Sequence, residues 1–144
     1  SNTWILVSDS GKALFVDDIH LTGLLQAAFV RSPHPHALIK SIDTSAARAV
    51  PGVTAVYTLA DFRPHIQADR LPLQFPSADF GPDVTPFLLA GDEVCHVGEV
   101  IAMVIANTRY VAEDAALLVD VDYQPLPSVA GCAAAFALER RGRG

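Results

Sequence analysis

Five histidines are the side chains of this sequence best suited to holding a metal ion, and two of them are close together. His34 and His36 lie two residues apart, beside the start of an expected strand. In an extended segment such a pair can share one face and chelate a transition metal. The third ligand of such a site would come from Asp17, Asp18 or His96.

The alternative for the Pro-His-Pro-His segment is a loop whose imidazoles bond backbone carbonyl groups or water. Each proline lacks a backbone donor and holds the preceding residue extended, which favours a loop. The sequence has no HxxxH or HExxH pattern, the spacings at which a helix presents two histidines to zinc. We therefore favour the loop and keep a small metal-dependent enzyme using His34 and His36 as an alternative.

The adjacent Cys95 and His96 suggest a thiolate nucleophile with its base, which would have to lie within hydrogen-bond reach. Neighbouring residues of a strand point to opposite faces, so the two side chains are poorly placed to pair. We expect Cys95 to be buried and unreactive, because free cysteine is among the most buried residue types. The second cysteine, Cys132, is distant and forms no CxxC pattern, which favours reduced thiols and a cytoplasmic protein.

Other catalytic and binding motifs are missing from the sequence. It contains neither GxGxxG nor GxxxxGK[ST], so no phosphate-binding loop is expected. We interpret Asp17 and Asp18 as a turn, because their carboxylates can bond nearby backbone N–H groups. Glu113 and Asp114 are expected on the solvated face of a helix.

Charge and hydropathy exclude two classes of partner. The net charge is −6, and the only basic cluster is Arg140, Arg141 and Arg143 in a Gly-containing tail, so we expect no nucleic-acid partner. The unbroken apolar run Val100–Ala106, which no other run exceeds, is far shorter than the roughly 20 residues that span a bilayer, so we expect no membrane partner.

Hydrophobic periodicity predicts an α+β domain with helices packed on a mixed or antiparallel sheet. Its strands are expected at 13–16, 24–31, 36–42, 53–57, 93–97, 100–106 and 119–124, and its helices at 45–49, 58–61 and 109–118. Thr58 and Asp61 have the spacing of a capping box. Residues 100–106 are assigned to the central strand, and Gly98 before them to a bulge or a close backbone approach. The near-continuous apolarity of residues 24–31 predicts that both faces of that strand are covered.

Two further elements have a clear amphipathic pattern. In the strand 119–124, Val119, Val121 and Tyr123 point to the buried side. Asn107 or Thr108 is expected to cap the helix at 109–118, whose buried face would carry Val111, Ala115 and Leu118.

Residues 63–92 are interrupted by five prolines and keep neither a helical nor a strand period. Structureless loops of this length are uncommon inside compact domains, and they often serve a function or wrap a partner. The predicted organisation is a disordered or tag-derived lead-in at 1–10, one domain at 11–129, and an Ala-rich segment with an Arg/Gly tail at 130–144.

Six segments, in register over residues 11–129, resemble the α/β hammerhead domain that opens the large subunit of molybdenum hydroxylases, the xanthine dehydrogenase, aldehyde oxidase and carbon monoxide dehydrogenase family. They are Gly11–Ile19 (G-x-A-x-Y/F-V-D-D-I), Arg31–Ala37 (R-S-P-x-A-H-A), Ile42–Ala47 with Pro51–Val53, Val97–Ala102 (V-G-x-x-V-A), Ala112–Ala116, and Val121–Pro127. The sequence departs from the family pattern at Phe15, Pro35 and Cys95-His96, and after Ser128.

The resemblance implies a non-catalytic scaffold that packs on molybdopterin-binding domains of the large subunit, in cis or in trans, and on FAD and iron–sulfur subunits. It implies no catalytic, cofactor-binding or metal-binding residue in this chain; molybdopterin, FAD and [2Fe–2S] clusters would belong to the parent enzyme. The scaffold positions that match the family motifs are Gly11, Asp17, Asp18, Arg31, Ser32, Pro33, His36, Gly52, Gly98, Glu113, Asp114 and Tyr123. A free-standing interaction module is the other alternative, and the substrate of the parent enzyme stays open.

Overall fold

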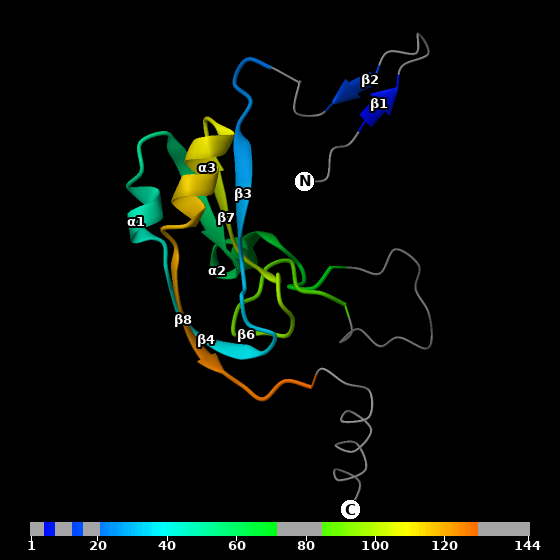
Figure 1. The fold of residues 1–144 in the computed structure, drawn as a ribbon, viewed down its shortest axis with the longest axis vertical. Helices are drawn as coiled ribbons and strands as arrows, with labels where there is room; N and C mark the ends of the chain where they lie inside the picture. Colours follow the sequence, from blue (N-terminus) through cyan, green and yellow to red (C-terminus); the bar gives the residue numbers. More distant parts are fainter. Residues whose placement is uncertain (1–4, 8–12, 16–20, 72–84, 130–144) are drawn as a thin grey trace, which may run out of the picture.

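A computed structural model describes residues 5–7, 13–15, 21–71 and 85–129 of the 144. Strands β1 (Ile5–Val7) and β2 (Ala13–Phe15) pair with each other in an antiparallel two-stranded sheet. The other described strands form two three-stranded sheets, in which every pairing is antiparallel (Figure 1). None of the described helices is long and apolar enough to cross a membrane.

The first sheet has the order β3-β7-β5. Its central strand, β7 (Val100–Ala106), lies between β3 (Gln26–Arg31) and β5 (Val53–Thr58). The prediction of a central strand at residues 100–106 is therefore confirmed. Its β-branched and apolar residues suit a strand that has a hydrogen-bonded neighbour on each side.

The second sheet has the order β6-β4-β8. It consists of β6 (Glu93–Val94), β4 (Ala37–Asp43) and β8 (Asp120–Pro125). Along β8 the odd positions Val121 and Tyr123 are half-buried and the even positions are exposed, as the alternation predicts. The hydrogen-bonded strand at residues 93–97 is shorter than expected, because a turn begins after Val94.

Short helices connect the two sheets. They are α1 (Ser45–Arg48), α2 (Leu59–Phe62), the 3-10 helix η2 (Arg63–His65) and α3 (Arg109–Ala116). The predicted capping box is present: Asp61 accepts hydrogen bonds from the Thr58 N–H and hydroxyl, and the first of these lowers the pKa of Asp61. Thr108 caps α3 by accepting from the Val111 N–H at 3.2 Å.

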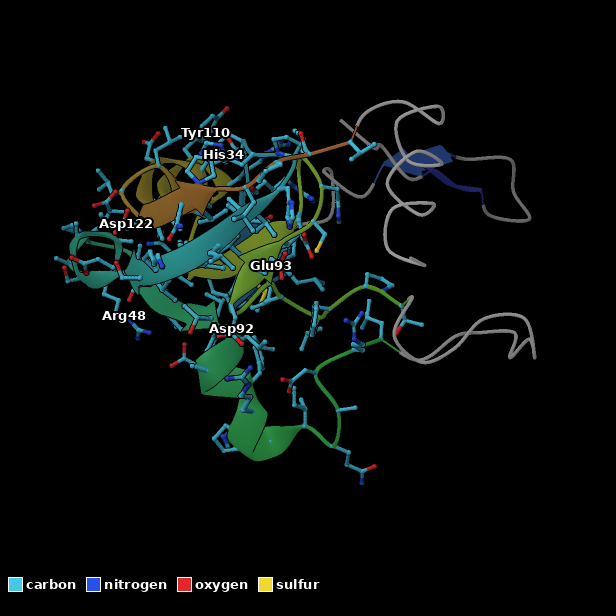
Figure 2. All side chains as sticks on the ribbon, turned by 90° about the horizontal axis from the view of Figure 1, so that it is seen from below. His34, Arg48, Asp92, Glu93, Tyr110 and Asp122 are labelled. Carbon is cyan, nitrogen blue, oxygen red and sulfur yellow. The ribbon has the colours of Figure 1, made fainter. Side chains whose placement is uncertain are left out.

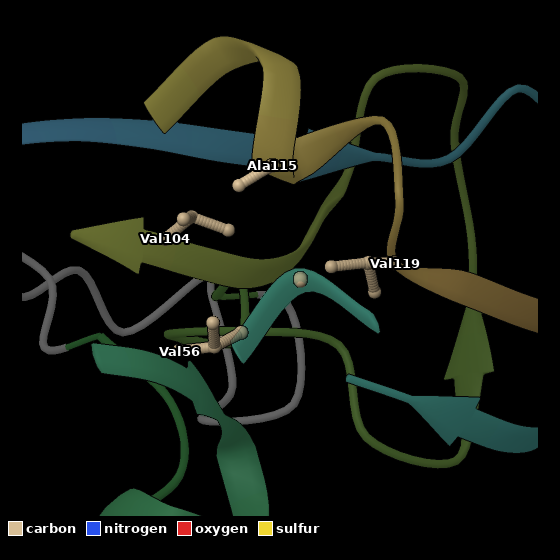
Figure 3. Packing of buried hydrophobic residues seen from close by; sticks show 5 residues of the cluster. Val56, Val104, Ala115 and Val119 are labelled. Carbon is tan, nitrogen blue, oxygen red and sulfur yellow. The ribbon is translucent and has the colours of Figure 1, made fainter. Parts of the chain in front are cut away.

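The core consists of two hydrophobic clusters, and each contains residues from both sheets. In the first, α3 and α1 place Ala115 and Ala47 against Val56 of β5 and Val104 of β7, with Val119 closing the cluster (Figure 3). In the second, Ile101 packs with residues Ala37, Ala90 and Val94. Ile42 and Val121 contact both clusters, so the two sheets are joined by continuous apolar packing.

Three sequence-based expectations need correction. Residues 24–31 are not covered on both faces, because alternate residues of β3 are exposed and the side chain of Phe29 is 47% exposed. The buried face of α3 carries Ala112 and Ala115 rather than Leu118, since the helix ends at Ala116. Residues 5–7 form a strand where no element was expected.

The proline-rich segment is only partly described. At its ends it has regular structure: η2 begins it, and an isolated antiparallel bridge joins Arg70 to Phe87. Residues 72–84 lie outside the described part, as do Gly11, Asp17, Asp18, Cys132 and the proposed tail at 130–144. The domain limits stay a prediction.

Candidate functional site

The motif segments at 31–37 and 97–102 meet at a turn between the two sheets. Gly98 has a φ of +88°, a conformation that glycine adopts without the cost of a Cβ, and its N–H donates to the Ser32 carbonyl at 2.8 Å. The Ser32 N–H donates in return to the Glu99 carbonyl at 2.9 Å, and Arg31 Nη1 donates to the Gly98 carbonyl at 2.8 Å. Gly98 thus enables a turn. No atom lies within 4 Å of the position that a Cβ would take, so the glycine is not needed to let another backbone segment approach closely.

Ser32 is one of the few buried polar residues among those described. Its hydroxyl lies 3.0 Å from the His34 N–H, from which it accepts, and 3.1 Å from the His34 carbonyl, to which it can donate. The His34 ring packs edge-on against Tyr123, with 4.7 Å between the ring centroids. Burial raises the pKa of Tyr123, against the lowering effect of a hydrogen bond with Ser32. These contacts fix the loop that carries Pro33 onto β8.

His36 connects three segments that are distant in the sequence. Its Nδ1 lies 2.8 Å from the Pro127 carbonyl oxygen, and its Nε2 lies 2.5 Å from Glu93 Oε1. A carbonyl and a carboxylate both accept hydrogen bonds, so this geometry suits a ring that carries a proton on each nitrogen. The pKa of His36 is accordingly raised, first by the Pro127 carbonyl and then by Glu93.

Neither histidine of the pair is placed to chelate a metal with the other. The His34 ring packs against Tyr123, and the ring nitrogens of His36 lie within hydrogen-bond distance of Pro127 and Glu93. Figure 2 shows that Glu93, beside which His36 lies, is apart from His34. An imidazole whose two nitrogens both donate has no lone pair for a metal ion. Within the described ranges, no three His, Cys, Asp or Glu residues are grouped as a metal site would require.

A buried carboxylate closes the same turn. Glu99 is 8% exposed, and its Oε2 accepts from the Cys95 N–H at 2.6 Å and lies 3.5 Å from His96 Nδ1. Cys95 itself is exposed, so its predicted burial is wrong. Its thiol pKa is nevertheless raised, by desolvation and then by the charges of Glu99 and Glu93, which disfavours the nucleophilic thiolate.

An open concavity of about 460 Å³ lies beside these residues. It is lined by Pro35, His36, Cys95, His96, Val97, Pro127, Ser128 and Val129. A nucleophilic site would need a low-pKa thiol or a neutral base facing this space. The concavity instead borders an imidazole and a thiol that both have a raised pKa, and the rings of His36 and His96 lie beside the carboxylates of Glu93 and Glu99.

The remaining scaffold positions lie away from this turn. Gly52 has a φ of +94°, its carbonyl accepts from the Asn107 N–H at 2.9 Å, and an added Cβ would lie 2.7 Å from Asn107 Oδ1. Glu113 pairs with Arg109 on the exposed side of α3, and Asp114 is exposed beside it, as predicted. Sequence reasoning identified neither Glu93 nor Glu99 as a partner. Glu93 bonds a residue 57 positions away, whereas Glu99 bonds Cys95 four positions away across a turn that has no recognised sequence pattern.

Residues 10–127 match the sequence family described as the aldehyde oxidase and xanthine dehydrogenase a/b hammerhead domain. The chain belongs to this family. The predicted fold class and the predicted resemblance are both confirmed.

Relatives of the hammerhead domain are much longer proteins. The chain is 50% identical over 117 residues to the carbon monoxide dehydrogenase large chain of Afipia carboxidovorans, covering 81% of this chain and 14% of that protein. It is 41% identical over 120 residues to the nicotine 6-hydroxylase large subunit of Paenarthrobacter nicotinovorans, covering 83% and 14%. The chain therefore spans about one seventh of these relatives.

Solved structures share the fold. A Cu,Mo-CO dehydrogenase in its carbon monoxide reduced state superimposes with a TM-score of 0.71 at 44% identity, over 85% of this chain and 14% of that chain. Quinoline 2-oxidoreductase from Pseudomonas putida 86 gives 0.73 at 40% identity, over 84% and 15%. The hammerhead domain is thus one part of large subunits that differ in their named substrates.

Proposed function

We propose that this chain is a non-catalytic structural domain of a molybdenum-hydroxylase-type large subunit, which packs on the molybdopterin-binding domains and on partner subunits in the cytoplasm. The observation that carries the proposal is that the motif side chains form hydrogen bonds within the chain. Arg31, Ser32, His36 and Glu99 each bond backbone groups of the chain itself. Such residues shape a scaffold, and the size of the relatives indicates what the scaffold would belong to.

The cofactors of the parent enzyme fit other parts of the protein better than this one. A [2Fe–2S] cluster takes four cysteine thiolates, or two with two histidines, and the chain has two cysteines, of which Cys95 has a raised thiol pKa. The sequence has no glycine-rich phosphate-binding pattern of the kind that dinucleotide cofactors use. We therefore assign no step of the reaction to these residues.

A domain replacement tests the proposal directly. The corresponding segment of the Afipia carboxidovorans carbon monoxide dehydrogenase large chain is replaced by residues 10–127 of this chain, and the chimera is co-expressed with the other subunits. We expect assembly and carbon monoxide oxidation close to those of the unmodified enzyme, because the exchanged domain would contribute shape and not reacting groups. An unassembled chimera would contradict the proposal.

The purified 144-residue chain provides the complementary measurement. We expect no stoichiometric metal by elemental analysis and the same metal content for His36→Ala. Stoichiometric metal in the folded chain that is lost in His36→Ala, together with turnover of any substrate, would instead establish the metal-dependent enzyme.

A further inference from the structure

The side of the first sheet that faces away from α3 is apolar across all three strands. The register places Phe29 and Tyr57 on either side of Met103, and Ala27 and Ala55 on either side of Ile105. These six residues alternate with the positions that point to the core, such as Val56 and Val104, so they share the opposite face. We call Ala27, Phe29, Ala55, Tyr57, Met103 and Ile105 the outer sheet face.

The outer sheet face is accessible in this chain. Phe29 is 47% exposed and Tyr57 36% exposed, Ala27 is exposed, and Ala55, Met103 and Ile105 are half-buried. Towards the start of β7 the same side of the sheet is covered, because Ile101 packs on Ala90 and Val94. The uncovered part is therefore limited to the two rows that contain Met103 and Ile105.

The composition of this face is unusual for a face in contact with water. An antiparallel sheet with one wet face alternates apolar and polar residues, whereas strands apolar on both sides are generally covered on both sides. None of the six residues of the outer sheet face is charged, and the one charged group that the described part of the structure places against them is the Arg31 guanidinium, 5.8 Å from the centre of the Phe29 ring. Leu24 and Leu25, which are 40% and 46% exposed, lie directly before β3 and add apolar surface at its start. Contiguous apolar surface of this kind marks an interaction site.

We propose that the outer sheet face is the surface on which the remaining part of the large chain docks, through an uncharged apolar surface of its own. This inference rests on the proposed function and specifies the contact that it requires. The occupant follows from the share of the relatives: about six sevenths of a large chain lie outside the matched region, and an uncharged face suits a permanent contact within one protein. A second copy of this chain and a segment of this chain are the competing occupants.

Met103 gives a direct readout, because it is the only methionine of the chain and lies in the centre of the outer sheet face. Its oxidation by dilute hydrogen peroxide is followed by peptide mass spectrometry, in the 144-residue chain and in the chimera described above. Oxidation depends on access to the sulfur. We expect Met103 to oxidise at least about tenfold more slowly in the chimera.

A matched pair of variants adds a second readout. Phe29→Thr makes the outer sheet face polar with a residue that strands accept, and Tyr110→Gln does the same to an aromatic residue that is 79% exposed on α3 and points away from the sheets in Figure 2. We expect Phe29→Thr to lower the urea midpoint of the isolated chain only slightly, no more than Ile105→Ala does, and to reduce the yield of assembled chimera several-fold. Tyr110→Gln is expected to change neither.

Each other outcome overturns the proposal in a recognisable way. Equal oxidation of Met103 in an active chimera and in the isolated chain removes the docking surface and leaves the proposed function intact. Protection of Met103 in the isolated chain that disappears on dilution assigns the face to a second copy. A fall in the urea midpoint of the isolated chain for Phe29→Thr as large as that for Val104→Ala assigns it to a segment of this chain. An unassembled chimera contradicts the proposed function and this inference together.

Discussion

Val104 and Ile105 are neighbours in β7, and their similar side chains differ in burial. Val104 is fully buried between α3 and β5, whereas Ile105 lies on the outer sheet face and is half-buried. Both are β-branched and both suit the same central strand. The difference arises from α1 and α3, which cover only one side of the sheet. Apolarity alone therefore does not distinguish the core from the uncovered face of the sheet in this chain.

The largest expected effect concerns these two residues. Val104→Ala should lower the free energy of unfolding by about 2.5 kcal/mol, because it removes buried methyl groups and leaves a cavity. Ile105→Ala should cost only about 1 kcal/mol in the isolated chain, mainly through lower strand propensity. Urea denaturation of both variants measures the difference. Equal losses would mean that the outer sheet face is already packed.

The turn that brings β5 beside β7 gives the next largest effect. Gly52→Ala should cost about 2 kcal/mol, because the left-handed φ disfavours any Cβ and this one would meet the Asn107 side chain. Gly98→Ala has the same kind of φ but open space, so about 1 kcal/mol is expected. Thermal unfolding of the pair separates conformational strain from steric contact; a larger loss at Gly98 would contradict this account.

The N-cap of α3 tests how firmly this helix covers the core side of the first sheet. Thr108→Ala should cost about 1 kcal/mol, because the Val111 N–H loses its acceptor. Thr108→Ser keeps a hydroxyl and should retain most of the stability. Chemical denaturation is the measurement. If the alanine and serine variants were equally destabilised, the methyl group rather than the cap would be responsible.

The smallest effect depends on pH and involves His36, which lies directly before β4 of the second sheet. Its pKa is raised in the folded chain, so its contribution to stability is complete below its unfolded pKa of about 6.5 and is lost as the pH rises through the folded value. The stability difference between the wild type and His36→Gln should therefore shrink from pH 6 towards pH 8. NMR titration should show a lower pKa of His36 in Glu93→Gln, and an unchanged pKa would exclude Glu93 as a cause.

Parts of the turn between the sheets could be anticipated from the sequence, and parts could not. The family resemblance selected Ser32 and Gly98, which are hydrogen-bonded to each other, and His36, which lines the concavity beside the same turn. It did not supply their partners: Glu93 bonds a histidine 57 positions earlier, and no local pattern encodes such a pairing. The prediction for Cys95 failed because an average tendency of cysteine to be buried says nothing about a turn that exposes one residue.

By itself, the sequence determined the local elements: the alternation along β8, the apolar run of β7, a helix cap at Asn107 or Thr108, and the capping box at Thr58. Each depends on interactions within a few residues, which composition and spacing describe well. Only the tertiary structure decided that β3 is an edge strand, that His36 is held by Glu93 and Pro127, and that one side of the first sheet is uncovered. Strand order and long-range hydrogen bonds follow from how the whole chain packs, and short-range patterns do not specify them.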